Sequence, residues 1–270
     1  DLYIKTEQGW SFYSPFRLSS LLHKTEQGWK ILHQHGSYPD AKTEEGEAFA
    51  FQQISKENQE LREAVRRRTA ELEHKNRELE TETALEKVRV TAMAMRKPED
   101  MLLVCRTISE QLGTLGVKEI RNIQTVIINK QTREYLNYQY FSPYDTDAVE
   151  IIDYTAHPVV NAFVEEMLRS DQAFFTKVFE GKELDEWRRH RNDTQQFTDP
   201  ILDKADAVYY YFFSIGSGAL GLSTYAPVSE ESLQIFRRFK NVFELSYKRY
   251  LDITQAEAQA REAQIEAALE

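Results

Sequence analysis

Residues 208–225 read Val-Tyr-Tyr-Tyr-Phe-Phe-Ser-Ile-Gly-Ser-Gly-Ala-Leu-Gly-Leu-Ser-Thr-Tyr, and they carry the clearest structural signal in the sequence. The aromatic run is typical of a strand, a second apolar strand follows it, and Gly216-Ser-Gly218 supplies the turn between them. Because the glycines of residues 216–221 lie between two strands and not before a helix, they do not form a phosphate-binding loop. The stretch therefore predicts an antiparallel β-hairpin.

The alternation of a strand divides the aromatic run between two faces. Tyr209, Tyr211 and Phe213 point to one face, and Tyr210 and Phe212 point to the other. Two interpretations stay open. The aromatics are core beneath helices, or Tyr209, Tyr211 and Phe213 line a pocket whose tyrosine hydroxyls bind a small ligand. A closed, dry face around Tyr209 and Tyr211 would favour the first interpretation.

The hairpin lies within a series of helical and extended patterns that fills the second half of the chain. Helices are expected at residues 101–115, 157–170 and 184–191, and from Ser229 to the end of the sequence. Strands are expected at residues 123–128, 134–141, 173–179, 208–214 and 219–225. This order predicts an α+β fold in which an antiparallel sheet is flanked by helices.

Residues 48–95 contain neither Gly nor Pro and carry a helical pattern. A heptad seam predicts a coiled coil and a parallel homodimer. Its candidate interface residues are Ile54, Asn58, Leu61, Val65, Leu72 and Leu79. A second seam, shifted by one position, marks the point where this connector joins a folded domain; it consists of Leu85, Val88, Ala92 and Met95. Alternatively, the helix is monomeric and Asn58 is merely polar.

Residues 1–40 read as β-structure, and the hexapeptide Lys-Thr-Glu-Gln-Gly-Trp occurs there twice, at 5–10 and 24–29. The repeat predicts two similar hairpin turns, although a duplicated segment gives the same pattern. The stretch Gly28 to Ser37, followed by Pro39, resembles the closing strand of SnoaL-like domains of the nuclear-transport-factor-2-like superfamily. This resemblance implies that residues 1–45 are the C-terminal strands of such a domain.

Residues 80–270 resemble the GAF-like module of bacterial multidomain sensor kinases and nucleotide cyclases. The resemblance rests on Ala84–Arg89 with Ala92–Met95, on Phe236–Phe239 with Tyr250–Ile253, and on the Ala- and Glu-rich run from Gln255 to Glu270. It implies a GAF-like sensor domain at 84–253 after a coiled-coil connector at 48–83. Residues 254–270 are then a helical linker to a following module.

The composition narrows the class of protein. The chain has 270 residues and a net charge of −10, which argues against nucleic-acid binding because that affinity rests on cations. It contains no apolar run long enough to span a membrane and no signal segment, so we expect a cytoplasmic protein without a membrane partner. The lone cysteine, Cys105, reads as a buried thiol; a chromophore attachment point is the weaker interpretation.

The histidines predict no metal site, and we expect no cofactor. His33 and His35 share a strand face but have no obvious third ligand. His74 lies on the connector helix, where a phosphoacceptor of a sensor kinase would also lie, yet the ATP-binding segments of such kinases are absent from this sequence. A solvated helix position is the simpler interpretation of His74.

Together these features predict a non-catalytic sensory relay segment of an intracellular multidomain signalling protein, such as a two-component system. A change driven by a ligand or a neighbouring domain would pass through paired helices to a kinase or cyclase domain of the same polypeptide. One alternative is a structural dimerisation module without a ligand. The other is a SnoaL-like cyclase or isomerase with His33 or His35 as general base.

Overall fold

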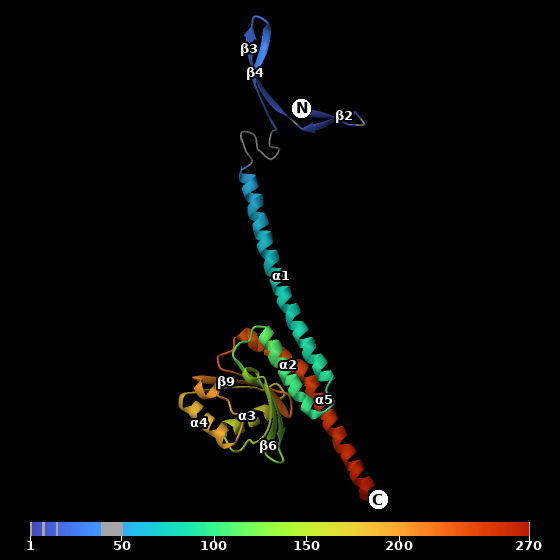
Figure 1. Ribbon diagram of the computed structural model, residues 1–270, viewed down its shortest axis with the longest axis vertical. Coiled ribbons are helices and arrows are strands. Elements are labelled where there is room, and N and C mark those ends of the chain that lie inside the picture. Colours follow the sequence, from blue (N-terminus) through green and yellow to red (C-terminus); the bar gives the residue numbers. More distant parts are fainter. Residues whose placement is uncertain (1, 7–8, 15, 39–50, 270) are drawn as a thin grey trace. The chain divides into compact units, whose positions relative to one another are not determined.

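The computed structural model describes residues 2–6, 9–14, 16–38 and 51–269, which form two compact units, 1–74 and 75–270 (Figure 1). The boundary between the units falls inside helix α1, Phe51–Met93. The predicted boundaries at residues 45 and 48 lie outside the described residues. The predicted boundary at residue 83 falls within α1, and the one at residue 253 falls within α5, Glu230–Leu269. The division into these domains stays a prediction.

The first unit contains two antiparallel hairpins and the first half of α1. Strands β1 (Leu2–Thr6) and β2 (Gly9–Ser14) form one hairpin, and β3 (Arg17–Thr25) and β4 (Gly28–Ser37) form the other. In both copies of the repeat, the Thr pairs with the Gly, Thr6 with Gly9 and Thr25 with Gly28. Both glycines have a left-handed backbone φ, +118° for Gly9 and +112° for Gly28, which residues with a side chain rarely adopt. The residues that flank the two predicted turns therefore pair in the same way, and residues 7–8 of the first turn lie outside the described residues.

The second hairpin leaves large apolar side chains exposed. Trp29 is 68% exposed, Leu32 is 62% exposed and Leu21 is 60% exposed. A two-stranded hairpin is marginally stable in water by itself. These strands therefore have the character of part of a larger sheet, and the described part of the chain does not cover them.

The second unit is an α+β sandwich around one six-stranded antiparallel sheet, which confirms the predicted fold class. The strand order is β7-β6-β5-β10-β9-β8. The strands are β5 (Ile120–Asn129), β6 (Glu134–Phe141), β7 (Thr146–Asp153), β8 (Phe174–Glu180), β9 (Ala207–Ser214) and β10 (Gly218–Thr224). The helices after α1 are α2 (Met101–Thr114), α3 (Pro158–Arg169), α4 (Gly181–Asp193) and α5, and short 3₁₀ turns occur at Pro98–Asp100, Ser142–Tyr144 and Leu202–Lys204.

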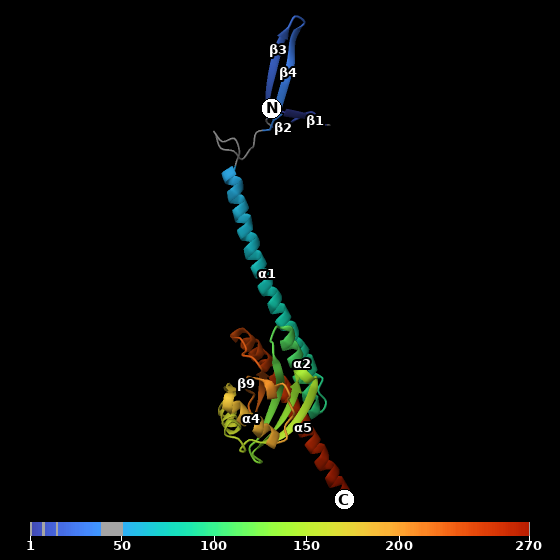
Figure 2. The same ribbon diagram turned by 60° about the vertical axis from the view of Figure 1, so that its left-hand side comes forward.

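The sheet separates two cores. The C-terminal part of α1, together with α2 and α5, packs on one face, and α3 and α4 cover the other (Figures 1 and 2). On the first face, Phe236, Phe239 and Phe243 of α5 are fully buried. The shifted seam joins this core, since Leu85 and Val88 of α1, and Met95 just after its end, are at most 5% exposed. These residues of the shifted seam are thus part of the second unit, which begins at residue 75, and the connector itself stays a prediction.

Candidate functional site

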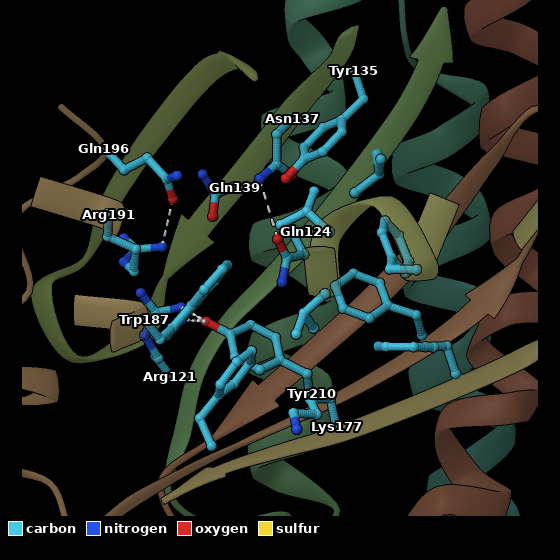
Figure 3. Close-up of a pocket in the computed structure, with 17 residues that line it drawn as sticks. Arg121, Gln124, Tyr135, Asn137, Gln139, Lys177, Trp187, Arg191, Gln196 and Tyr210 are labelled. Atoms are coloured by element: carbon cyan, nitrogen blue, oxygen red, sulfur yellow. Dashed lines mark hydrogen bonds between the residues drawn. The ribbon is translucent and has the colours of Figure 1, made fainter. Parts of the chain in front are cut away.

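A cavity lies between the sheet and the layer formed by α3 and α4 (Figure 3). The space that the centre of a water molecule can reach there is about 50 Å³. Aromatic side chains form much of its wall; they are Tyr135, Phe163, Phe175, Phe179, Trp187, Tyr210 and Phe212. The polar side chains in the wall are Arg121, Gln124, Asn137, Gln139, Lys177, Arg191 and Gln196.

The pleat of the sheet places these residues on one face. Tyr135, Asn137 and Gln139 are alternate residues of β6, and Tyr210 and Phe212 are alternate residues of β9. Phe175, Lys177 and Phe179 follow the same spacing on β8. The cavity is therefore built from every second residue of neighbouring strands.

Arg121 reaches this face through a β-bulge. Asn122 pairs with Ser223 of β10 and Ile120 pairs with Thr224, so Arg121 has no opposite residue in β10. A bulge of this kind redirects one side chain, and bulges concentrate beside functional sites. Ile120 packs on the helical face with α2 and α5, whereas Arg121 and Gln124 both line the cavity.

Arg121 forms a fully buried ion pair with Asp199. Its Nε donates to Asp199 Oδ2 at 2.6 Å, and the two side chains are 1% and 2% exposed. Asp199 Oδ1 also accepts hydrogen bonds from the hydroxyls of Tyr144 (2.7 Å) and Tyr225 (2.9 Å). Burial by itself would raise the pKa of Asp199, but the charge of Arg121 and these hydrogen bonds outweigh it, so the pKa lies below its usual value.

A second guanidinium, that of Arg191 on α4, lies in the same wall and is 6% exposed. It donates to two neutral oxygens, Gln196 Oε1 at 2.9 Å and the carbonyl of Phe197 at 3.0 Å. Burial, and then the charge of Arg121, lower its pKa, yet a guanidinium stays protonated because its usual pKa is above about 12. The wall thus holds two guanidiniums, of which Arg121 alone forms an ion pair among the described residues. The third cation of the wall, Lys177, pairs with Glu183 at 2.6 Å.

Two amide pairs connect β5 and β6 beside these cations. Asn137 Nδ2 donates to Gln124 Oε1 at 3.2 Å, and Asn122 Nδ2 donates to Gln139 Oε1 at 2.8 Å. Gln139 Nε2 in turn donates to Glu150 on β7 at 2.6 Å. This chain of hydrogen bonds satisfies the Asn122–Gln139 pair, whereas the Asn137–Gln124 pair keeps unpaired polar atoms among the described residues.

Three polar atoms in this wall have no hydrogen-bond partner among the described residues. They are Arg121 Nη2, Gln124 Nε2 and Asn137 Oδ1. Leaving such a group buried and unpaired costs about 1–3 kcal/mol, and more for a charged group. Three of them around one cavity are what a site for a polar ligand provides.

The aromatic wall continues into a pair of half-buried histidines. Trp187 Nε1 donates to the Tyr210 hydroxyl at 3.0 Å, and the Trp187 ring stacks on His190 with centroids 5.5 Å apart. The ring of His157, which caps α3 by accepting from Val159 N, lies 4.6 Å from His190. Burial lowers the pKa of both histidines, and the charge of His157 lowers the pKa of His190 further.

The three residues proposed as a pocket lie on the opposite face of the sheet. Tyr211 and Phe213 are buried in the core with α2 and α5, and Tyr209 packs at its edge. The Tyr211 hydroxyl accepts from Val228 N at 3.1 Å, just before α5 begins. The cavity is lined by their neighbours Tyr210 and Phe212, and ligand binding at Tyr209, Tyr211 and Phe213 stays a prediction.

The candidate dimer residues lie on the outer surface of α1. Leu61, Val65, Leu72 and Leu79 are 51–66% exposed, and Asn58 is exposed too. The side chain of Ile54 lies outside the described residues. A row of exposed apolar side chains at this spacing fits a helical partner, and the homodimer stays a prediction.

Of the remaining candidates, Cys105 and His74 occupy the environments that their simpler interpretations predict. Cys105 is fully buried, and burial raises the pKa of its thiol to about 12. His33, His35 and His74 are exposed. Among the described residues, no group of three or more His, Cys, Asp or Glu side chains could hold a metal ion.

Sequence reasoning missed the polar wall. A signal for it was present, because Asn122 and Gln124 alternate in β5, and Asn137 and Gln139 alternate in β6. Two polar pairs at strand spacing, in neighbouring apolar strands, indicate a polar patch on a covered face. No periodicity could have placed Arg121 there, because its direction depends on the bulge.

Comparison with known proteins adds one family. Residues 1–41 match the SnoaL-like domain family, in agreement with the resemblance of the β4 segment. No curated protein matches the chain. Among the described residues, none of the helices is both long enough and apolar enough to cross a membrane. The GAF-like resemblance of residues 80–270 stays a prediction.

Proposed function

We propose that this chain is a ligand-responsive relay, in which the cavity of residues 75–270 binds a small molecule and the sheet passes the change to α1 and α5. One observation carries the proposal. The strands that line the cavity with one face support the core of long helices with the other. The relay is non-catalytic and belongs to a multidomain signalling protein, in which α5 acts on a kinase or cyclase domain.

Neighbouring residues of single strands link the two faces. Tyr210 lines the cavity, and Tyr211 beside it holds the N-terminal end of α5 through Val228. Asn137 lines the cavity, and the ring of Tyr138 beside it lies edge-on against Tyr250 of α5, 6.0 Å between centroids. Because packed side chains transmit strain, a ligand that displaces Asn137 or Tyr210 would repack the contacts of α5.

In this proposal, a parallel homodimer formed through the outer face of α1 passes the change on, and the exposure of that face supports it. At about 100° per residue, Leu79 and Val90 lie on the side of α1 opposite to Val88 and Ala92, both of which are fully buried. Leu79 and Val90 are 65% and 60% exposed. The heptad repeat continues this outer side towards the N-terminal end of α1, so a second copy of α1 would cover it.

The relay is tested by placing a charge in the cavity. Gln124→Glu keeps the shape of the side chain and the acceptor for Asn137 Nδ2, and it introduces a carboxylate beside two guanidiniums. We expect hydrogen exchange to change in residues 81–93 and 230–253 as well as in β5 and β6. The matched control is Gln131→Glu in an exposed turn. Changes confined to the strands and α3 would refute the relay.

The dimer is tested on α1 itself. Leu72→Glu should convert a dimer to a monomer in light scattering, because an apolar seam does not accept a charge. Ala70→Glu, two positions along the helix and therefore on its far side, should leave the dimer intact. Equal masses for both variants would remove α1 as the interface.

The two other interpretations keep specific support. The face with Tyr209 and Tyr211 is packed, which by itself favours a structural module without a ligand. The SnoaL-like match over residues 1–41 favours an enzyme of that family, with exposed His33 or His35 as general base. Loss of a turnover activity in His33→Ala, with the relay test negative, would favour the enzyme.

A further inference from the structure

The three unpaired atoms of the cavity specify what a ligand must offer. Arg121 Nη2 and Gln124 Nε2 are donors, and Asn137 Oδ1 is an acceptor. Their residues are 0%, 5% and 3% exposed. A complementary ligand offers two acceptors, one to the cationic donor Arg121 Nη2 and one to the amide N–H, and it offers one donor to the amide oxygen.

The amide part of this pattern does not depend on how the two amides are oriented. Exchanging the oxygen and nitrogen of both Gln124 and Asn137 preserves their mutual hydrogen bond. It leaves one N–H and one carbonyl oxygen unpaired, as before. The wall therefore offers one amide donor and one amide acceptor in either arrangement.

We propose that the cavity binds a small 2-hydroxycarboxylate, an inference that rests on the ligand-binding function proposed above. The carboxylate oxygens accept from Arg121 Nη2 and from the amide donor, and the 2-hydroxyl donates to the amide acceptor. Arg191 contributes a second positive charge, since its own hydrogen bonds go to neutral oxygens. The carbon chain faces Phe163, Phe212 and the other rings of the wall.

The size of the cavity limits the ligand. A water molecule needs roughly 10–15 Å³ of such space, so about 50 Å³ holds about three to five non-hydrogen atoms. Glycolate, with two carbons and three oxygens, fits this limit, whereas lactate, with six non-hydrogen atoms, exceeds it. A nucleotide or a sugar does not fit.

The unpaired amide acceptor in the wall lets the cavity distinguish 2-hydroxycarboxylates from other small anions. Sulfate, an oxyanion that carries acceptors only, would leave the amide acceptor unpaired beside a negative charge. Acetate satisfies the donors but has no hydroxyl for the amide acceptor. The cavity should therefore prefer glycolate over acetate by about tenfold or more, the loss associated with one buried unpaired group.

The test uses the full chain with Trp10→Phe and Trp29→Phe, which leaves Trp187 as its single tryptophan. Trp187 lines the cavity and reports binding by its fluorescence. Glycolate, lactate, acetate and sulfate are titrated by fluorescence and by calorimetry. We expect saturable binding of glycolate, about tenfold weaker binding of acetate and of the larger lactate, and no binding of sulfate.

The same Glu substitutions supply the controls. Gln124→Glu should abolish glycolate binding by placing a carboxylate where the ligand's carboxylate lies, and Gln131→Glu should leave binding unchanged. Acetate binding as tight as glycolate, or glycolate binding unaffected by Gln124→Glu, would overturn the proposal. So would the absence of any response to the four anions.

These outcomes remain separable from failure of the relay. If glycolate does not bind but Gln124→Glu alters hydrogen exchange in α1 and α5, the ligand class is wrong and the relay stands. If glycolate binds as expected while exchange in α1 and α5 stays constant, the ligand class stands and the relay falls.

Discussion

Asp199→Asn is the most informative single substitution for the stability of the second unit. It preserves the size of the side chain and removes the charge opposite Arg121, whose side chain is 1% exposed. Removing one partner of a buried ion pair costs about 3–5 kcal/mol, because the remaining charge stays buried without compensation. The new amide N–H₂ also faces a donor, Arg121 Nε, or the hydroxyls of Tyr144 and Tyr225.

The magnitude converts into a measurable change in melting temperature. For a domain of this size, each kcal/mol lowers the Tm by about 2–4 °C, so Asp199→Asn should lower it by roughly 6–20 °C. Asp185→Asn is the matched control, since its ion pair with Arg188 lies at the surface, where the Asp185 side chain is 65% exposed. Such a surface pair contributes at most about 1 kcal/mol.

The same pair predicts a dependence of stability on pH. The pKa of Asp199 is lower in the folded chain than in the unfolded chain, where it is about 3.9. Its contribution is therefore fully present above about pH 4 and is lost as the pH falls through the folded pKa. Urea unfolding between pH 3 and 7 should show a shallower acid slope for Asp199→Asn. Loss of less than about 1 kcal/mol, with an unchanged slope, would refute the assignment of the charge pair.

Three further predictions concern other parts of the second unit. Gly221→Ala should destabilise the fold by about 1–3 kcal/mol in urea, because its Cβ would lie 2.3 Å from the Phe212 ring and 2.8 Å from Gln124 Cγ; unchanged stability would show that the cavity wall yields freely. Cys105 should resist a thiol reagent at pH 8 until the protein unfolds, since burial raises its pKa to about 12; rapid labelling of the native chain would contradict its burial. Burial lowers the pKa of His190 below its unfolded value of about 6.5, so the stability that the neutral ring contributes is present above that pH and is lost on acidification. His190→Gln should therefore flatten the pH dependence of the unfolding free energy between pH 5 and 7, and a pH profile parallel to that of the wild type would refute this role of His190.

The order of elements could be predicted because apolar periodicity is strong in most of them. Strands β6, β9 and β10 lie close to their expected ranges, and α2 and α3 do too. Strand β7 was not predicted, because at the sheet edge only Ile152 of its eight residues is buried and its carboxylates interrupt the apolar pattern. An edge strand needs less apolar surface than a central strand, and its sequence signal is correspondingly weak.

The candidate pocket could be predicted only as far as the strand that supports it. Alternation separated Tyr209, Tyr211 and Phe213 from Tyr210 and Phe212, and that separation agrees with the two cores. Which face receives the terminal helices depends on tertiary packing between segments far apart in the sequence. A single strand carries no information about that choice. The cavity is lined by Tyr210 and Phe212, on the face that the predicted pocket did not include.

The polar residues of that face explain why the two cores differ in character. A sheet covered on both sides is stabilised most simply by apolar side chains on both faces, as at the Phe236 side. Arg121, Arg191, Gln124 and Asn137 replace that apolar surface at a cost that the Asp199 pair only partly offsets. Proteins keep destabilising buried polar groups of this kind mainly at functional sites. The bulge that directs Arg121 into the cavity is part of the same arrangement, because a regular strand would direct that side chain into the helical core. The polar groups of the proposed ligand site are thus concentrated on one face of the sheet, and the packing that would transmit its effect is concentrated on the other.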